Sequence, residues 1–155
     1  MLAPGGQVCP STDIVFVLDQ SGSIGWPNFD RVKEFVSRLV GRLDIDSGNV
    51  RVGLVTYSTR VSTGFNLSDY NRVASVQSAI SSIRYEDPRG TTSTDLALAH
   101  VRTSMLTSAA GDRYNAPNVV IVLTDGESNN FTATKVSKIR RSFTMGQGAF
   151  ATSQI

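Results

Sequence analysis

Two uninterrupted apolar runs constrain the fold of this chain more than any other feature. Residues Ile14–Leu18 read Ile-Val-Phe-Val-Leu, and residues Val119–Leu123 read Val-Val-Ile-Val-Leu. A strand with one face in water alternates apolar and polar residues, whereas a strand of a parallel sheet is covered on both faces and is apolar throughout. A third run, Val50–Tyr57, is less pure, with Gly53 where a neighbouring helix can approach closely. The sequence therefore predicts a parallel sheet built from these segments.

Helical periodicity fills the segments between these runs. From Phe29 to Leu43, apolar residues recur with a period near 3.6, after a helix-start signal at Pro27 and Asn28. Shorter stripes follow over 73–83 and 97–105, and alternation over 61–65 predicts an antiparallel edge strand. Strands that alternate with helices fold as a mostly parallel sheet between two helix layers. We therefore expect an α/β fold with a doubly wound, mostly parallel sheet, helices on both faces and one antiparallel edge strand.

The chain length of 155 residues fits a single domain. Residues 1–12 are rich in Pro, Gly, Ser and Thr without periodicity, which is typical of a linker, so we place the domain at 13–155. From about residue 131 the pattern weakens. A helix-like stretch (132–141) and a few strand-like residues (142–145) precede Gly-Gln-Gly. We expect the closing strand and helix of the sheet to be truncated, because neither has room for its full length.

Composition excludes several classes of function. One Cys and one His exclude a disulfide framework and any site that needs two or more of these ligands, such as a zinc or iron–sulfur centre. Net charge is +2, and the basic groups after residue 127 lack interleaved aromatics, so we expect no nucleic-acid partner. Since the longest apolar runs have five residues, we expect no membrane span in this chain.

The compartment is indicated only by weak features. The first ten residues have neither the basic nor the apolar region of a signal peptide. Two N-x-[ST] sequons make Asn66 and Asn130 candidate glycosylation sites. Cys9 is either an inert thiol or half of a disulfide with a partner outside this chain. We interpret the chain as a fragment or isoform of a larger, secreted protein.

Three clusters of oxygen-bearing side chains stand where such a sheet binds ligands. They are 19–23 (Asp-Gln-Ser-Gly-Ser) after the first apolar run, 124–126 (Thr-Asp-Gly) after the last, and 90–94 (Gly-Thr-Thr-Ser-Thr) at the start of a helix. Ligands of doubly wound sheets bind beyond the carboxyl ends of the strands. Two carboxylates at adjacent strand ends repel each other unless a cation lies between them. Hydroxyl and carboxylate ligands favour Mg²⁺, Mn²⁺ or Ca²⁺ over softer metals.

Each cluster also has an ordinary structural interpretation. Ser21 and Ser23 could form a tight turn that Asp19 caps, and Thr92 or Thr94 could be the N-cap of a helix. The Asp-x-Ser-x-Ser pattern is a weak match on its own in so serine-rich a chain. Few chance matches to this pattern would also stand directly after a buried strand. Three such clusters at converging strand ends favour a binding site.

The ordered set of motifs resembles the von Willebrand factor type A domain, the module of collagen type VI, matrilins and integrin inserted domains. The resemblance runs from about residue 13 to residue 130. The matching text is DIVFVLDQSGSIG, NFDRVKEFV, RVGLVTYS, TSTDLAL and APNVVIVLTDGES. It implies a Rossmann-like fold that carries a metal-ion-dependent adhesion site. Asp95 departs from the family pattern, which usually has Gly there.

The resemblance also implies a set of metal ligands. Ser21, Ser23 and Thr92 would bind Mg²⁺, Mn²⁺ or Ca²⁺ through their hydroxyls. Asp19 and Asp125 would hold the ion directly or through water. Thr94 matches the second Thr of the family's T-x-T and is the weaker candidate.

The function implied is a cell-adhesion or extracellular-matrix module that is not an enzyme. Its metal would take an acidic side chain from a protein partner, with collagen or another matrix protein as the expected class. A Mg²⁺-dependent hydrolase with Asp19 as nucleophile is an alternative, but it needs a second Asp at position 21, where Ser21 stands, and a Lys, which is absent between Lys33 and Lys135. His100 lies in a predicted helix and is no evident general base. An intracellular type A domain used for complex assembly is the other alternative, and the sequons weigh against it.

Overall fold

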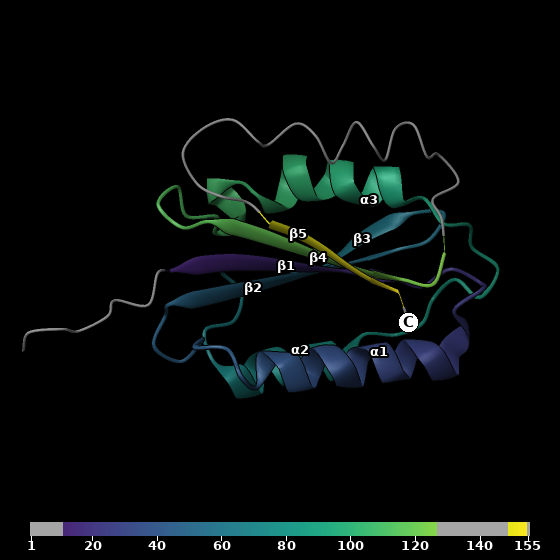
Figure 1. Cartoon of the computed structure of the whole chain (residues 1–155), viewed down its shortest axis with the longest axis horizontal. Helices are drawn as coiled ribbons and strands as arrows, with labels where there is room; N and C mark the ends of the chain where they lie inside the picture. The colour runs from purple at the N-terminus through teal and green to yellow at the C-terminus, as the bar shows by residue number, and fades with distance from the viewer. Residues whose placement is uncertain (1–10, 127–148, 155) are drawn as a thin grey trace, which may run out of the picture.

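A computed structural model describes residues 11–126 and 149–154 (Figure 1). One sheet has the strand order β3-β2-β1-β4-β5. The strands are β1 (Thr12–Asp19), β2 (Val50–Tyr57), β3 (Val61–Phe65), β4 (Asn118–Thr124) and β5 (Ala149–Gln154). The pairs β1–β2, β1–β4 and β4–β5 are parallel, and β2–β3 is antiparallel. The predicted α/β fold with one antiparallel edge strand is therefore confirmed.

Helices cover both faces of the sheet. In Figure 1, α1 (Gly25–Val40) and α2 (Val73–Ser82) lie below the sheet, and α3 (Thr94–His100) lies above it. A π-helical turn, η1 (Val101–Met105), continues α3, and a short 3-10 turn, η2 (Ser108–Ala110), follows. No helix among the described residues combines the length and the apolar character that a membrane crossing needs.

Burial explains why the first strand is apolar throughout. Phe16 and Leu18 pack in the core between the sheet and helices α1 and α2, whereas Val15 and Val17 pack in the core between the sheet and α3. All four side chains are fully buried. Successive side chains of a strand point to opposite faces, so both sets must be apolar when both faces are covered. The expectation drawn from the apolar runs holds for this physical reason.

The closing strand corrects one expectation. β5 is a six-residue strand that pairs with β4 from Val119↔Ala149 to Thr124↔Gln154. We expected this strand to be truncated for lack of room, but its six residues pair along most of β4. The strand was not evident in the sequence because a segment that pairs along the free edge of β4 need not be apolar throughout. The helix-like stretch 132–141 and the strand-like residues 142–145 lie outside the described residues, as do residues 1–10 of the predicted linker. The first strand begins at Thr12, the last residue of that linker.

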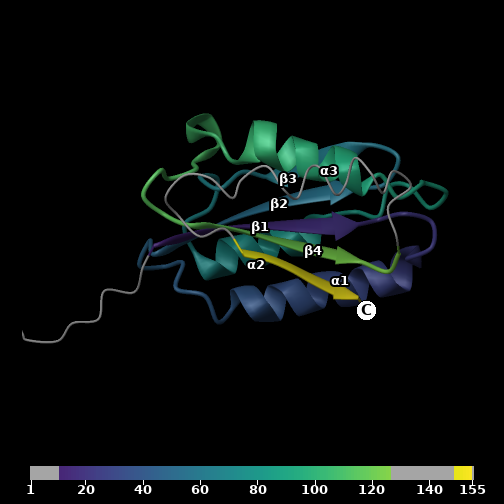
Figure 2. The same ribbon diagram turned by 45° about the horizontal axis from the view of Figure 1, so that its top comes forward.

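The strand register sets the position of the candidate site. Asp19 lies opposite Tyr57, and Leu18 lies opposite Leu123. Figure 2 shows β1, β4 and β5 pointing toward the same edge. Because β1, β2 and β4 are parallel and end at matching positions, the loops that follow them meet at the carboxyl edge of the sheet.

Candidate metal site at the carboxyl edge of the sheet

Asp19 is the innermost carboxylate of the site. It is the last residue of β1, and its side chain is fully buried. The backbone N–H of Ser21 donates to Asp19 Oδ1 over 2.8 Å, and the hydroxyl of Thr124 donates to Asp19 Oδ2 over 2.6 Å. A buried carboxylate needs such donors, because its desolvation is otherwise unfavourable. Asp19 is thus fixed by both loops that carry candidate ligands.

A row of oxygen atoms leads from Asp19 toward solvent. The hydroxyl oxygens of Ser21 and Ser23 lie 3.1 Å apart, and the Ser23 hydroxyl donates to Asp125 Oδ1 over 3.1 Å. Ser21 is buried, whereas Ser23 and Asp125 are exposed. The structure therefore brings four of the five predicted ligands together, with one open side.

The spacing of these oxygen atoms fits a hard divalent cation. Adjacent oxygen ligands of an octahedral Mg²⁺, each at about 2.1 Å from the ion, lie about 3 Å from one another. Both the Ser21–Ser23 and the Ser23–Asp125 oxygen pairs lie at 3.1 Å. In the described part of the chain, no cluster of three or more His, Cys, Asp and Glu residues could hold a metal. The donor set is therefore one of hydroxyls and two carboxylates, which suits Mg²⁺ or Mn²⁺ better than a softer metal.

Thr92 reaches this edge on the loop between α2 and α3. Its side chain makes no hydrogen bond to the other four candidate ligands within the described residues. The loop itself is tied to the serine loop, since the N–H of Gly22 donates to the Gly90 carbonyl over 3.0 Å. Thr92 is 9% exposed. Its place at the edge is set by the backbone, and its hydroxyl is not committed to the other ligands.

Tyr57 is a residue of the site that sequence analysis missed. Its hydroxyl lies 3.1 Å from the hydroxyl of Thr94, inside the protein. Burial, together with the nearby charge of Asp19, raises the pKa of Tyr57 to about 12. Tyr57 therefore stays neutral at physiological pH. The Thr94 hydroxyl is engaged in the hydrogen bond with Tyr57. No pattern in the sequence signals this pair, whereas Thr124 could have been suspected from its place directly before Asp125.

The other predicted residues lie elsewhere or outside the described residues. Asn66 follows β3 in a turn, where its N–H donates to Asp69 Oδ2 over 2.7 Å, and its side chain is half-buried. His100 Nε2 lies 2.7 Å from the hydroxyl of Thr63 and links α3 to the edge strand. Asn130 lies outside the described residues, as does Cys9.

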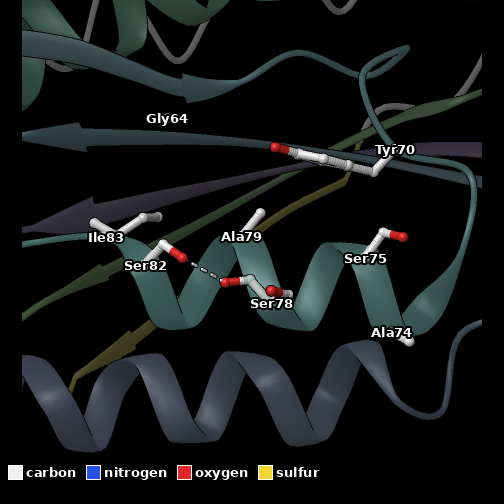
Figure 3. Close-up of a pocket in the computed structure, with 8 residues that line it drawn as sticks. All are labelled: Gly64, Tyr70, Ala74, Ser75, Ser78, Ala79, Ser82 and Ile83. Carbon is white, nitrogen blue, oxygen red and sulfur yellow. Dashed lines mark hydrogen bonds between the residues drawn. The ribbon is translucent and has the colours of Figure 1, made fainter.

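A second concave surface is a groove of about 610 Å³ between α2 and β3. Figure 3 shows Tyr70 beside the small side chains of α2. The lining residues are Gly64, Tyr70, Ala74, Ser75, Ser78, Ala79, Ser82 and Ile83. The lining contains no Asp, Glu, His or Cys, so this groove offers none of the usual charged or imidazole ligands of a cation.

Comparisons with known proteins identify the family of this chain. The model of the von Willebrand factor type A domain matches residues 13–148. The chain is 36% identical to the collagen alpha-4(VI) chain of Mus musculus over 141 residues, which is 90% of this chain and 6% of that protein. It is 40% identical to matrilin-4 of Homo sapiens over 121 residues, which is 76% of this chain and 19% of that protein. The chain thus spans a small part of each of these relatives.

One solved structure with the same fold is that of proximal thread matrix protein 1 from the mussel byssus, described with a zinc-occupied MIDAS motif. Its TM-score is 0.79 at 24% identity, and the match covers 92% of this chain and 37% of that one. At 24% identity, this structural similarity shows that the two chains share a fold.

Proposed function

Because this chain belongs to the von Willebrand factor type A domain family, we propose that it is a protein-binding module of the extracellular matrix whose binding depends on a divalent cation. Relatives among the collagens and matrilins support the matrix setting. We place the module at residues 13–155, after a linker over 1–12. Secretion, and glycans on Asn66 and Asn130, belong to the same proposal.

The proposed ligands of the cation divide into two kinds. Ser21, Ser23 and Thr92 would offer neutral hydroxyl oxygens, and Asp125 would offer a carboxylate at the exposed side. Asp19 would act through water, because both of its oxygens already accept hydrogen bonds. Mg²⁺ is the expected ion, with Mn²⁺ or Ca²⁺ as substitutes.

The arrangement suits binding of an acidic partner. A bound cation would carry positive charge that the chain's own ligands neutralise only in part. A Glu or Asp carboxylate of a protein partner would complete its coordination. That carboxylate would approach on the side where Ser23 and Asp125 are exposed. The carrying observation is the 3.1 Å spacing of the Ser21, Ser23 and Asp125 oxygens. Collagen or another matrix protein is the proposed class of partner.

We propose no catalytic role for the site. The chain's one histidine, His100, is engaged with Thr63 and not with Asp19. Tyr57 stays protonated near neutral pH and is no base. The relatives among matrix proteins point the same way.

Binding to immobilised collagen and to immobilised matrix extract tests the proposal, with Mg²⁺ and then with EDTA. We expect binding in Mg²⁺ that is lost in EDTA and in Thr92→Ala. Thr103→Ala is the matched control, because the Thr103 hydroxyl donates to the Ala99 carbonyl on the helix and lies away from the site. Binding that persists in EDTA would contradict a cation-dependent function.

A further inference from the structure

We infer that Ser58 and Asp87 form a clip that positions Thr92 for the cation. The inference rests on the proposed metal site and adds two positioning residues to it. Neither residue is a proposed ligand. Both act through the loop that carries Thr92.

Ser58 holds this loop on both sides of Thr92. It follows β2 directly and is 2% exposed. Its hydroxyl donates to Asp87 Oδ2 over 2.7 Å, and its carbonyl accepts from the N–H of Ser93 over 3.0 Å. One buried residue therefore fixes the start and the end of the segment 87–93.

The segment is closed further by its own backbone. The N–H of Gly90 donates to the Asp87 carbonyl over 3.0 Å, and the N–H of Thr91 donates to the hydroxyl of Thr59 over 3.0 Å. A Cβ at Gly90 would lie 2.7 Å from Ser58 Cβ and would also meet the Asp87 carboxylate. The Asp87 side chain is thus folded beneath Gly90 against Ser58, and a larger residue at position 90 would have to displace one of them.

This clip has a consequence for cation binding. A ligand must stay within about 0.5 Å of its productive position, and the groups behind it supply that restraint. Thr92 makes no hydrogen bond with the other candidate ligands in the described part of the chain, so its position depends on the loop. Ser21 and Ser23 keep their own hydrogen bonds to Asp19 and Asp125, so opening the clip should displace Thr92 more than the other candidate ligands.

Calorimetric titration of the full chain with Mn²⁺ tests the inference. Asp87→Ala should weaken Mn²⁺ binding by about tenfold, as is typical when a residue behind a metal ligand is removed. Asp87→Asn keeps an oxygen that accepts the Ser58 hydrogen bond and should stay much closer to the wild type. Ser58→Ala keeps the Asp87 charge but removes the hydroxyl, and it should weaken binding as Asp87→Ala does.

The matched control is Asp44→Ala. Asp44 resembles Asp87, because hydrogen bonds lower the pKa of both, with a serine hydroxyl as the main cause. Asp44 lies in the loop before β2, at the opposite edge of the sheet, and its replacement should leave Mn²⁺ affinity unchanged. A thermal melt of every variant shows whether the chain remains folded.

A double-mutant cycle decides whether the clip acts through Thr92. In a Thr92→Ala background, Asp87→Ala should cost no further affinity, because the oxygen that the clip positions is gone. An equal loss in both backgrounds would overturn the inference, as would an Asp87→Asn loss as large as that of Asp87→Ala, which would indicate a charge effect. Wild-type affinity in Asp87→Ala would also overturn it and leave the proposed function standing. A wild-type chain that binds no Mn²⁺ would overturn both.

Discussion

The hydroxyl of Thr124 donates a 2.6 Å hydrogen bond to the carboxylate of Asp19, although 105 residues separate them in the chain. The pair joins the carboxyl end of β4 to that of β1. Since Asp19 also accepts the N–H of Ser21, one buried carboxylate orients both loops that carry candidate ligands.

Replacing Thr124 with Val removes this hydrogen bond while keeping the shape of the side chain. The buried Asp19 carboxylate loses one of its two donors, and we expect the free energy of unfolding to fall by about 1–3 kcal/mol. Mn²⁺ affinity should fall as well, because Asp19 is less well held. Urea denaturation and calorimetry measure the two effects. Thr103→Val is the control, and equal stability of the two variants would count against the role of Thr124.

Gly22 should tolerate no side chain. A Cβ there would lie 2.8 Å from the carbonyl oxygen of Pro88, in the loop that carries Thr92. Gly22→Ala must push this loop away, and we expect weaker Mn²⁺ binding in a chain that still melts cooperatively. Gly41→Ala is the control, because its new methyl comes nearest to the Gln77 side-chain amide, at 3.2 Å, and lies in ordinary contact with the carbonyl oxygens of Arg38 and Ser37. Unchanged Mn²⁺ affinity in Gly22→Ala would show that the two loops need not touch.

Tyr57 should titrate far above an ordinary tyrosine. Burial, and then the charge of Asp19, raises its pKa to about 12. Its folded pKa lies above the unfolded value of about 10, so its contribution to stability is complete below pH 10 and is lost as pH rises toward 12. Tyrosinate absorbance of the wild type minus that of Tyr57→Phe should show one step near pH 12. A step near pH 10 would mean that the hydroxyl is open to solvent.

Arg113 should matter for stability and not for the cation. It lies 2.7 Å from the fully buried carboxylate of Asp13, at the amino edge of the sheet, and also donates to the carbonyls of Thr12, Gly48 and Asn49. Arg113→Met leaves Asp13 without its counter-charge, which costs about 3–5 kcal/mol for a buried pair. Urea denaturation should show this loss. If Arg113→Met stays folded but binds Mn²⁺ more weakly, the amino edge of the sheet would affect the candidate site at the carboxyl edge. That result would contradict this prediction.

The sequence was sufficient for the features that depend on local pattern. A strand covered on both faces must be apolar throughout, which is why Ile14–Leu18 and Val119–Leu123 were recognisable as β1 and β4. The candidate ligands were found because they directly follow strands or open a helix. Helix α1 begins at Gly25, before the signal at Pro27, because proline is tolerated in the first turn of a helix.

Features that depend on the pairing of distant segments were not predictable. The Thr124–Asp19 and Tyr57–Thr94 hydrogen bonds follow from strand register and helix placement, which no local pattern encodes. β5 was missed for the same reason: Ala149–Gln154 becomes a strand because it pairs with the free edge of β4. The single predicted stripe over 97–105 is divided between α3 and η1.

The most direct test of the account is calorimetric titration of the full chain with Mg²⁺ and Mn²⁺, beside the variants Asp19→Ala and Thr92→Ala. We expect the wild type to bind a divalent cation and both variants to bind it at least about tenfold more weakly while they remain folded. Metal affinity that is unchanged in both variants would contradict the assignment of the site.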